Sequence, residues 1–514
     1  PGPNGVQLLD DTWPILAAEH VHHVGEPLAL VAAATREAAR QALSAIEVEY
    51  EELSPVLSWE EAELREPLCD LEQKKGNVEQ GLAEADLVLE EEYRTGHQEH
   101  IYIETQGMIA SFGDDGSLRI IGSMQCPYYV ENALTHALNL TSDKIFVRPA
   151  AVGGGFGGKE DFPSVLAIHT ALLARAVKRP VKIVYDRHED IIGTTKRHPS
   201  RIRHRMGIDR EGRLVALDLQ VDLDGGAYRT LSPVVLSRAV LHATGPYRCP
   251  HVRIRGRVLQ THTVPNAAFR GFGAPQVAFA AERRMDQAAR AVGLDPYEIR
   301  VRNVVRPGDE LATGQVLDGS TAAVECLEEV VERAGFQRRW KANEKKRGRR
   351  RDGETLNGIG LSQYFHGAGF TGLGEHHMRS PVTVRLRTDG RMEILASSTE
   401  MGQGCSTVLP QIAATAAGVE LEDVVLHDPD TGEVPDSGPT VASRTTMIVG
   451  GVLARAAAEL RDGLLEWVGK TFDPRDELTL RGGQVYQGTL AVGGFRDLAM
   501  KAVASEGTFE RTVR

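Results

Sequence analysis

The sequence predicts an α+β protein of several domains, because short strand-like runs and a few clear helical stretches occur together in each part of the chain. Two helices are expected over residues 165–177 and 277–292, where apolar residues recur at helical spacing. The first ends before Arg179-Pro180 and the second at Gly293, both common stop signals. A chain of 514 residues has room for about three domains at roughly 150 residues each.

Residues 1–62 predict a small first α+β domain. Residues 27–31 and 48–50 are apolar runs typical of strands, and the Ala-rich stretch 36–46 between them has helical periodicity. The turn-forming sequence Lys75-Gly76-Asn77 then leads into the next segment.

The rest of the chain predicts two larger domains joined by a linker. Residues 75–310 hold the two helices among short strands and loops, and residues 311–351 form the linker. Nine of the fourteen linker residues from Arg338 to Arg351 are Lys or Arg, which we interpret as a solvated stretch. The last domain, 352–514, has two expected strands and a long helix, at residues 382–386, 392–395 and 445–468.

Composition argues against several classes of protein. The net charge of −12 disfavours a nucleic-acid partner, because a phosphate-binding surface needs a basic excess. The apolar run from Leu28 to Ala34 is far shorter than the roughly 18 residues that cross a membrane. The five cysteines are scattered and form no C-x-x-C pair, which predicts no disulfide framework or iron–sulfur site and favours a cytoplasmic location.

Four glycine-rich loops are the most informative part of the sequence. Glycines allow successive backbone N–H groups to converge on an anion or a flat ligand, because no Cβ obstructs the approach. The loops are Gly153-Gly154-Gly155-Phe156-Gly157-Gly158-Lys159-Glu160, Phe269-Arg270-Gly271-Phe272-Gly273-Ala274-Pro275-Gln276, Phe365-His366-Gly367-Ala368-Gly369-Phe370 and Glu400-Met401-Gly402-Gln403-Gly404.

The first loop also fits two nucleotide-binding patterns. As G-x-x-x-x-G-K it matches a phosphate-binding loop, yet Glu160 follows Lys159 where a hydroxyl must hold Mg²⁺. As G-x-G-x-x-G it lacks the acidic residue about twenty positions on that a dinucleotide site requires. We interpret both matches as accidental, and a nucleotide-binding or non-catalytic scaffold protein stays as the less favoured alternative.

Taken together, the loops resemble those of the molybdenum-binding subunit of the xanthine dehydrogenase and aldehyde oxidase family. The resemblance implies a partial α/β hammerhead domain at residues 1–62 and two elongated molybdopterin-binding α+β domains, the second incomplete. The ordered motifs that carry it are Val24-Gly25-Glu26-Pro27, Gly96-His97-Gln98-Glu99-His100, the Gly153 loop, Arg197-His198-Pro199, Asp224-Gly225-Gly226-Ala227-Tyr228, the Phe269 loop, the Glu400 loop and Ser437-Gly438-Pro439-Thr440-Val441-Ala442-Ser443.

In that family such loops cradle molybdopterin, with the cytosine dinucleotide form as one option here. The resemblance places Gln98, Phe156 and Arg270 beside the molybdenum. The cofactor-binding residues it implies are Gln98, Gly155, Phe156, Gly157, Arg270, Gln403, Val441, Ala442 and Ser443. The last three precede the helix expected at Thr445, whose N-terminal amides suit an anion.

The resemblance also implies a substrate. Purine enzymes of the family place a glutamate, an arginine and a phenylalanine where this chain has Glu160, Arg238 and Phe272. A carboxylate and a guanidinium can hydrogen-bond a heterocycle and stabilise charge on it. The implied reaction is hydroxylation of a purine or related N-heterocycle with oxygen from water, as in purine catabolism, with Gln98, Glu160 and Arg238 as catalytic candidates. Aldehyde-oxidising relatives usually lack the charged pair, and an aldehyde oxidoreductase is the main alternative.

One position departs from the purine pattern. The purine enzymes carry a second phenylalanine near residues 358–365, where Leu361 stands in this chain. Phe365 and Phe370 are the nearby candidates to replace it.

The remaining parts of the reaction are expected outside this chain. The family's general base, a glutamate in a late G-x-G-E-P-like loop, is expected beyond Arg514, and neither Glu26 nor Glu375 is assigned that role. The resemblance implies that electrons leave through a 2Fe–2S subunit and an FAD subunit in a hetero-oligomer.

Overall fold

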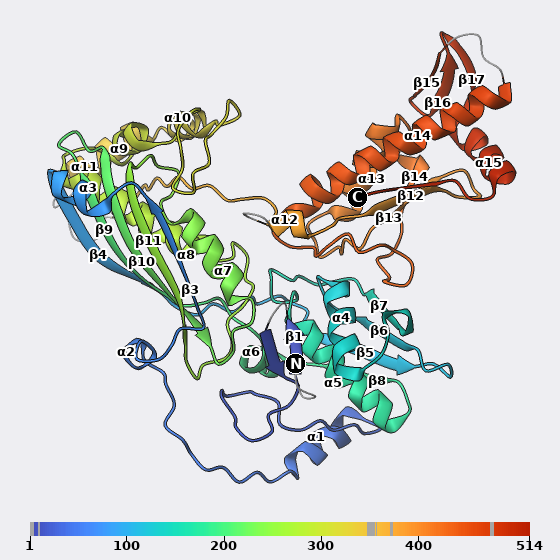
Figure 1. Cartoon of the computed structure of the whole chain (residues 1–514), viewed down its shortest axis with the longest axis horizontal. Coiled ribbons are helices and arrows are strands. Elements are labelled where there is room, and N and C mark those ends of the chain that lie inside the picture. Colours follow the sequence, from blue (N-terminus) through green and yellow to red (C-terminus); the bar gives the residue numbers. More distant parts are fainter. Residues whose placement is uncertain (1–4, 9–10, 347–354, 356, 371–373, 473–476) are drawn as a thin grey trace.

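The computed structural model describes residues 5–8, 11–346, 355, 357–370, 374–472 and 477–514. In this part of the chain the strands form five separate sheets with helices packed beside them (Figure 1). The α+β prediction is confirmed.

A five-stranded sheet forms one half of the first large domain. Its order is β3-β11-β10-β9-β4, in which β10 and β11 run parallel and the other neighbours antiparallel. Helices α7 (Ser232–His242) and α8 (Ala274–Ala291) pack on it around Leu219, Val240 and Val277. The strands are β3 (Cys69–Lys75), β4 (Leu87–Thr95), β9 (Ser200–Ile208), β10 (Leu214–Gly226) and β11 (His251–Gln260).

A four-stranded sheet, with the order β7-β6-β5-β8, forms the other half. Helices α4 (Pro127–Leu138) and α5 (Phe162–Val177) pack against it. Trp13 of the N-terminal hairpin is buried in the same core, with its ring centre 5.9 Å from that of Phe162. The strands are β1 (Gly5–Leu8), β2 (Asp11–Pro14), β5 (Gly107–Phe112), β6 (Leu118–Gly122), β7 (Ile145–Pro149) and β8 (Val181–Val184).

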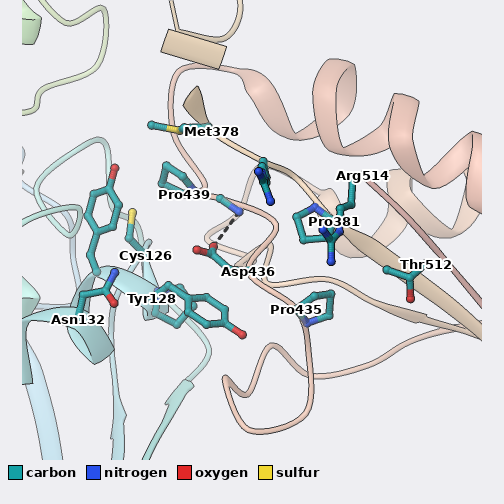
Figure 2. Close-up of a pocket in the computed structure, with 14 residues that line it drawn as sticks. Cys126, Tyr128, Asn132, Met378, Pro381, Pro435, Asp436, Pro439, Thr512 and Arg514 are labelled. Atoms are coloured by element: carbon teal, nitrogen blue, oxygen red, sulfur yellow. Dashed lines mark hydrogen bonds between the residues drawn. The ribbon is translucent and has the colours of Figure 1, made fainter. Parts of the chain in front are cut away.

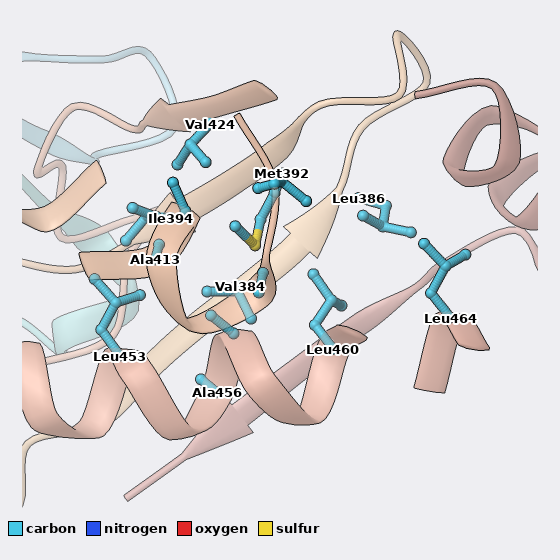
Figure 3. Close-up of a cluster of buried hydrophobic side chains, with 14 of the residues drawn as sticks. Val384, Leu386, Met392, Ile394, Ala413, Val424, Leu453, Ala456, Leu460 and Leu464 are labelled. Atoms are coloured by element: carbon cyan, nitrogen blue, oxygen red, sulfur yellow. The ribbon is translucent and has the colours of Figure 1, made fainter. Parts of the chain in front are cut away.

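The last domain packs helices α13 (Cys405–Ala417) and α14 (Gly450–Phe472) on a sheet of order β14-β13-β12-β18. Figure 3 shows Val384 and Ile394 of the sheet facing Leu453 of α14. The two expected strands are confirmed. The elements are β12 (Val382–Leu386), β13 (Met392–Leu395), β14 (Val424–Leu426) and β18 (Glu510–Val513), beside a second sheet of β15 (Leu478–Arg481), β16 (Gln484–Gln487) and β17 (Leu490–Gly494) with α15 (Phe495–Glu506).

The predicted helices form with small shifts at their ends. The first two begin three residues earlier than expected, at Phe162 and Ala274, because Pro163 and Pro275 occupy the first turn, where proline is well tolerated. The long helix of the last domain opens with a π-helical turn over Thr445–Val449.

The strands predicted in the first domain are wrong. Helix α1 (Arg36–Ser44) forms, but residues 27–31 and 48–50 are extended without a β-ladder. A strand needs a neighbouring strand for its backbone hydrogen bonds, and neither segment pairs with another strand in the part of the chain that the structure describes.

The segment predicted as a linker is helical over much of its length. Helices α10 (Ala323–Arg333) and α11 (Phe336–Lys346) pack beside α9 (Pro296–Asn303) through a small core that includes Phe336. The basic side chains of α11 are exposed, and residues 347–351 of the basic stretch lie outside the described residues. The other short helices are α2 (Trp59–Ala62), α3 (Val78–Glu84), α6 (Arg187–Gly193) and α12 (Gly374–His377). None of the helices described is long and apolar enough to span a bilayer.

Candidate active site

The glycine-rich loops meet around one cavity of about 1350 Å³, called the central cavity below. Residues of both large domains contribute to its wall. Every residue proposed for cofactor or substrate binding lines it except Gln98; those present are Gly155, Phe156, Gly157, Glu160, Arg238, Arg270, Phe272, Gln403, Val441, Ala442 and Ser443.

A second, smaller pocket of about 620 Å³ adjoins the central cavity and shares Tyr129 and Met378 with it. Figure 2 shows Cys126 at the start of α4 on one side of this pocket and Asp436 and Pro439 of the last domain on the other. The two domains therefore contribute to both hollows.

The Gly153 loop is clamped between two neighbours. The Gly157 N–H donates to Oε1 of Gln125 at 3.0 Å, and the Arg270 N–H donates to the carbonyl of Phe156 at 2.9 Å. A Cβ on Gly155 would come within 2.5 Å of Gln125 Oε1. Sequence reasoning missed Gln125, because a single glutamine ahead of a helix carries no signal of its own.

Lys159 does not face the central cavity. Its side chain is fully buried, where Nζ donates to Oε2 of Glu104 at 2.9 Å and to Oγ of Ser123 at 2.8 Å, above the ring of Tyr102. A phosphate-binding loop requires this lysine to reach the phosphates. The nucleotide-binding alternative is therefore disfavoured.

Glu160 lines the cavity and is buried. Its carboxyl makes no hydrogen bond or ion pair with any residue that the structure describes. Burial, reinforced by the neighbouring Asp161, raises the pKa of Glu160 well above its usual range, and the charge of Arg238 only partly opposes this. The raised pKa favours the neutral form of this carboxyl, which is the form that can donate a hydrogen bond into the cavity.

Arg238 reaches the cavity from α7. Its guanidinium donates to the carbonyls of Gly367 at 2.7 Å and Gly369 at 2.6 Å, and burial lowers its pKa. Arg238 and Glu160 share the wall without forming an ion pair, so the arginine is held by backbone carbonyls.

Several residues that line the cavity have a strained backbone. Phe156, Phe272, Ala442 and Ser443 have φ angles of 54°, 52°, 52° and 55°. Non-glycine residues rarely adopt such angles unless the surroundings enforce them, and they cluster at functional sites. The sequence does not predict these positive φ angles, because none of these residue types favours them.

The aromatic wall contains the two phenylalanines that the sequence offered as replacements at the Leu361 position. Leu361 packs against the small core around Phe336 and does not line the cavity. Phe365 and Phe370 line it instead, and the ring of Phe365 stacks on His242 with 5.0 Å between ring centres.

Gln98 and Gln403 are both engaged with protein groups. Arg197 Nε donates to Oε1 of Gln98, while Arg197 Nη2 donates to the Arg270 carbonyl at 2.9 Å. Gln403 accepts from the Met401 N–H at 2.7 Å and donates to the Thr399 carbonyl at 2.8 Å.

Glu26 and Glu375 lie in segments whose sequences are similar to the general-base loop, but both side chains have other partners. Glu26 accepts from the hydroxyl of Tyr228 and from the His22 N–H. Glu375 forms an ion pair with Arg444 at 3.1 Å. Both carboxylates support local structure.

Comparison with known proteins agrees with this layout. Residues 61–304 and 329–514 each match a molybdopterin cofactor-binding domain. Residues 2–54 match the a/b hammerhead domain of aldehyde oxidase and xanthine dehydrogenase. The chain belongs to the molybdenum hydroxylase family. Its fold is accordingly a hammerhead domain followed by two molybdopterin-binding domains.

The relatives that this chain resembles have several named activities. It is 33% identical to a probable xanthine dehydrogenase subunit of Bacillus subtilis, over 91% of this chain and 63% of that protein. It is 36% identical to the nicotinate dehydrogenase large molybdopterin subunit of Eubacterium barkeri, over 65% of this chain and 80% of that subunit. Xanthine dehydrogenase of Emericella nidulans is 34% identical over 87% of this chain, which spans only 33% of that protein.

Two solved structures resemble the molybdenum hydroxylase chain over 99% of its length. Quinoline 2-oxidoreductase from Pseudomonas putida 86 is 26% identical with a TM-score of 0.87, and the match covers 68% of that chain. Aldehyde oxidoreductase from Desulfovibrio gigas is 25% identical with a TM-score of 0.81, and the match covers 54% of that chain.

The cavity wall fits a molybdopterin. The backbone N–H groups of Val441, Ala442 and Ser443 have no acceptor among the described residues, and they lie ahead of the π-helical turn. A Cβ at Gly402 or Gly404 would meet nothing within 4 Å, so the loop leaves open space beside these donors. Unpaired N–H groups suit an anionic phosphate or the acceptor atoms of a pterin.

Proposed function

We propose that this chain carries the molybdenum site of a hydroxylase that adds oxygen from water to a carbon of a purine or related N-heterocycle, like a xanthine dehydrogenase. The named activities of its relatives support the substrate class, because xanthine, nicotinate and quinoline are all nitrogen heteroaromatics. The same family includes aldehyde oxidoreductases, so the choice between a heterocycle and an aldehyde as substrate depends on the residues that line the cavity.

The observation that carries the proposal is the unpaired Glu160 carboxyl. Burying a carboxyl without a partner is costly, and an aldehyde offers only one acceptor oxygen for the groups on this wall. A purine ring offers several nitrogen acceptors, and Glu160 and Arg238 can each contact a different one. We therefore favour the heterocycle over the aldehyde.

When bound, molybdopterin supplies the molybdenum centre that provides the oxygen and takes up two electrons. Glu160, kept protonated by its raised pKa, donates from its carboxyl O–H to a ring nitrogen. Arg238 donates from its guanidinium to ring atoms that gain negative charge, which stabilises the transition state more than the ground state. Phe272 would contact the ring face, and Phe156 and Arg270, which line the cavity, would lie beside the metal together with Gln98, which does not line it.

The backbone N–H groups of Val441, Ala442 and Ser443 would hold the pterin, and Gln403, Gly155 and Gly157 would line the space around it. The electrons then pass to a 2Fe–2S subunit and an FAD subunit, and the names of two relatives as subunits support a hetero-oligomer. The cytosine dinucleotide form of the cofactor is one option, and the adjoining pocket in Figure 2 offers room beside the central cavity.

The test uses the native complex expressed with its partners under anaerobic conditions. We expect hypoxanthine, xanthine or nicotinate to bleach the iron–sulfur and flavin absorbance much faster than benzaldehyde. The Glu160→Ala variant should lower kcat/KM for the heterocycle by about 100-fold, since a hydrogen bond to charge in the transition state is worth roughly 2–3 kcal/mol, and should leave aldehyde oxidation nearly unchanged.

The matched control is Glu37→Ala, which removes an exposed glutamate from α1. This variant should leave both rates unchanged. Bleaching by benzaldehyde alone would show that the enzyme oxidises aldehydes. Glu160 and Arg238 would then have only structural roles.

A further inference from the structure

Gln125 connects the two large domains at the central cavity. It lies between β6 and α4 of the first domain, and its side chain is buried and lines the cavity. Its Oε1 accepts from the Gly157 N–H at 3.0 Å, and its Nε2 donates to the Thr440 carbonyl at 3.3 Å. Gly157 belongs to the Gly153 loop, whereas Thr440 belongs to segment 437–443 of the last domain, called the Ser437 loop below. One amide therefore bonds a loop from each domain.

These two contacts fix the orientation of the Gln125 amide. A backbone N–H only donates and a carbonyl only accepts, so the amide oxygen must face Gly157 and the NH2 group must face Thr440. The reversed amide would place a donor against a donor and an acceptor against an acceptor. The backbone N–H of Gln125 also donates to the Lys159 carbonyl at 2.7 Å, near the end of the Gly153 loop. Three hydrogen bonds thus hold this residue in place.

The Gly153 loop is fixed within the first domain. The Gly153 N–H donates to Oε2 of Glu104 at 2.6 Å, and the Gly158 N–H donates to the Gly155 carbonyl at 2.8 Å. A Cβ on Gly155 would lie 2.5 Å from Oε1 of Gln125, so the loop packs directly against the amide. The position of this loop therefore depends on Gln125.

The Ser437 loop is fixed within the last domain. The backbone N–H of Ser437 donates to the hydroxyl of Ser397 at 2.9 Å, and the Ser397 N–H donates to the Ser437 hydroxyl at 3.2 Å. The Thr440 hydroxyl accepts from the Thr399 N–H at 2.9 Å. Each loop is thus anchored in its own domain, and the side chain of Gln125 spans the distance between them.

We infer that Gln125 is a positioning residue that sets the spacing between the metal side and the pterin side of the molybdopterin site. The inference rests on the proposed function, which places Phe156 beside the metal and the backbone donors of residues 441–443 against the pterin. A ligand held at both ends tolerates little change in the distance between its two binding loops. A misplacement of about 1 Å can lower a reaction rate by about 100-fold.

Electron paramagnetic resonance of the native complex, expressed with its partners and partly reduced with dithionite, tests this spacing. Dithionite reduces the metal without a substrate, so the spectrum does not depend on which compound the complex oxidises. The Gln125→Met variant keeps a side chain of similar length but loses both hydrogen bonds. We expect its metal signal to shift, and we expect kcat for the heterocycle, normalised to molybdenum content, to fall by about 10- to 100-fold.

The Gln125→Asn variant separates spacing from hydrogen bonding. Its amide is carried on a side chain one methylene shorter, which cannot reach both Gly157 and Thr440 at their present separation, so its signal should also shift.

The matched control is Thr431→Val. The Thr431 hydroxyl accepts from the Val147 N–H at 3.1 Å, so it also joins the last domain to the first, but Thr431 lines neither pocket. The variant loses a hydrogen bond between the domains without touching the loops. It should keep the parent signal and the parent kcat.

The outcomes separate positioning from general support of the contact between the domains. A parent signal with parent kcat in Gln125→Met or in Gln125→Asn overturns the inference, as do equal changes in Gln125→Met and Thr431→Val. If the parent complex oxidises no heterocycle but both Gln125 variants still shift the signal, the positioning role stands and the proposed reaction fails.

Discussion

Arg197 and Gln98 are joined side chain to side chain, with Arg197 Nε donating to Oε1 of Gln98. Because arginine only donates, Oε1 of Gln98 must face Arg197, and the NH2 group of the amide is directed away from it. Arg197 also holds the Arg270 carbonyl and lies 3.9 Å above the centre of the Phe269 ring. It therefore links the Gln98 loop to the Phe269 loop and acts as a positioning residue.

Arg197→Lys should keep the charge but lose this linkage. We expect kcat to fall by about 10- to 100-fold, because the Gln98 amide is no longer oriented and one to two hydrogen bonds donated by the buried Arg197 side chain are lost. Molybdenum content should stay near the parent value, while the electron paramagnetic resonance signal of the partly reduced metal shifts. A normal signal with normal kcat would contradict the positioning role. Arg210→Lys, at an exposed ion pair with Asp86, is the control.

The pH dependence of activity should report on Glu160. Its raised pKa means that the neutral form required for donation to a ring nitrogen persists to higher pH than in an ordinary glutamate and is lost as the pH rises through the folded-state pKa. We expect kcat/KM for the heterocycle to fall on this alkaline side, measured from pH 6 to pH 10. The Glu160→Gln variant has an amide that stays neutral and can donate, so its kcat/KM should not decrease at alkaline pH. An unchanged decrease in this variant would show that another group titrates there.

The free energy of unfolding should also depend on the protonation of Glu160. It should fall as the pH rises, whereas the contribution of an ion-paired carboxylate falls as the pH is lowered. The unfolded chain releases the Glu160 proton near its ordinary pKa of about 4.3, whereas the folded protein retains it. The contribution of this group to the free energy of unfolding is therefore complete below that pH and declines as the pH rises toward the folded pKa. Urea denaturation at a series of pH values should show a shallower decline in Glu160→Gln.

Gly157→Ala should reduce cofactor content. Gly157 has a φ of 99°, and a Cβ there would lie 2.9 Å from the backbone of Ala268, so neither the chain nor its neighbour can accommodate the methyl group without a shift. Metal analysis of the purified complex should find less molybdenum per protein. Gly319→Ala, where a Cβ meets nothing within 4 Å, should load normally.

Leu453→Ala tests the core of the last domain. The side chain is fully buried between α14 and the sheet (Figure 3), so its truncation should lower the free energy of unfolding by about 2–5 kcal/mol. Urea denaturation of the complex measures the change. Leu490→Ala, at a side chain that is 70% exposed, should have little effect; equal losses in both variants would contradict the assigned core.

Much of the fold and the family could be read from local sequence. Periodic apolar residues predict helices over 165–177 and 277–292, which form over 162–177 and 274–291, and glycines mark the loops. The strands expected at 27–31 and 48–50 failed because a strand depends on a partner that its own residues do not specify.

The order of the loops and the residue types they offer are properties of the chain alone, and they were sufficient to indicate the molybdenum hydroxylase family. Three placements depend instead on tertiary packing: Lys159 turns away from the cavity, Phe365 rather than Leu361 lines it, and His366 lies beside Arg238. The physical reason is distance along the chain. The bond from Arg238 to Gly369 joins residues 131 positions apart, and packing of two domains, not local propensity, brings such groups together.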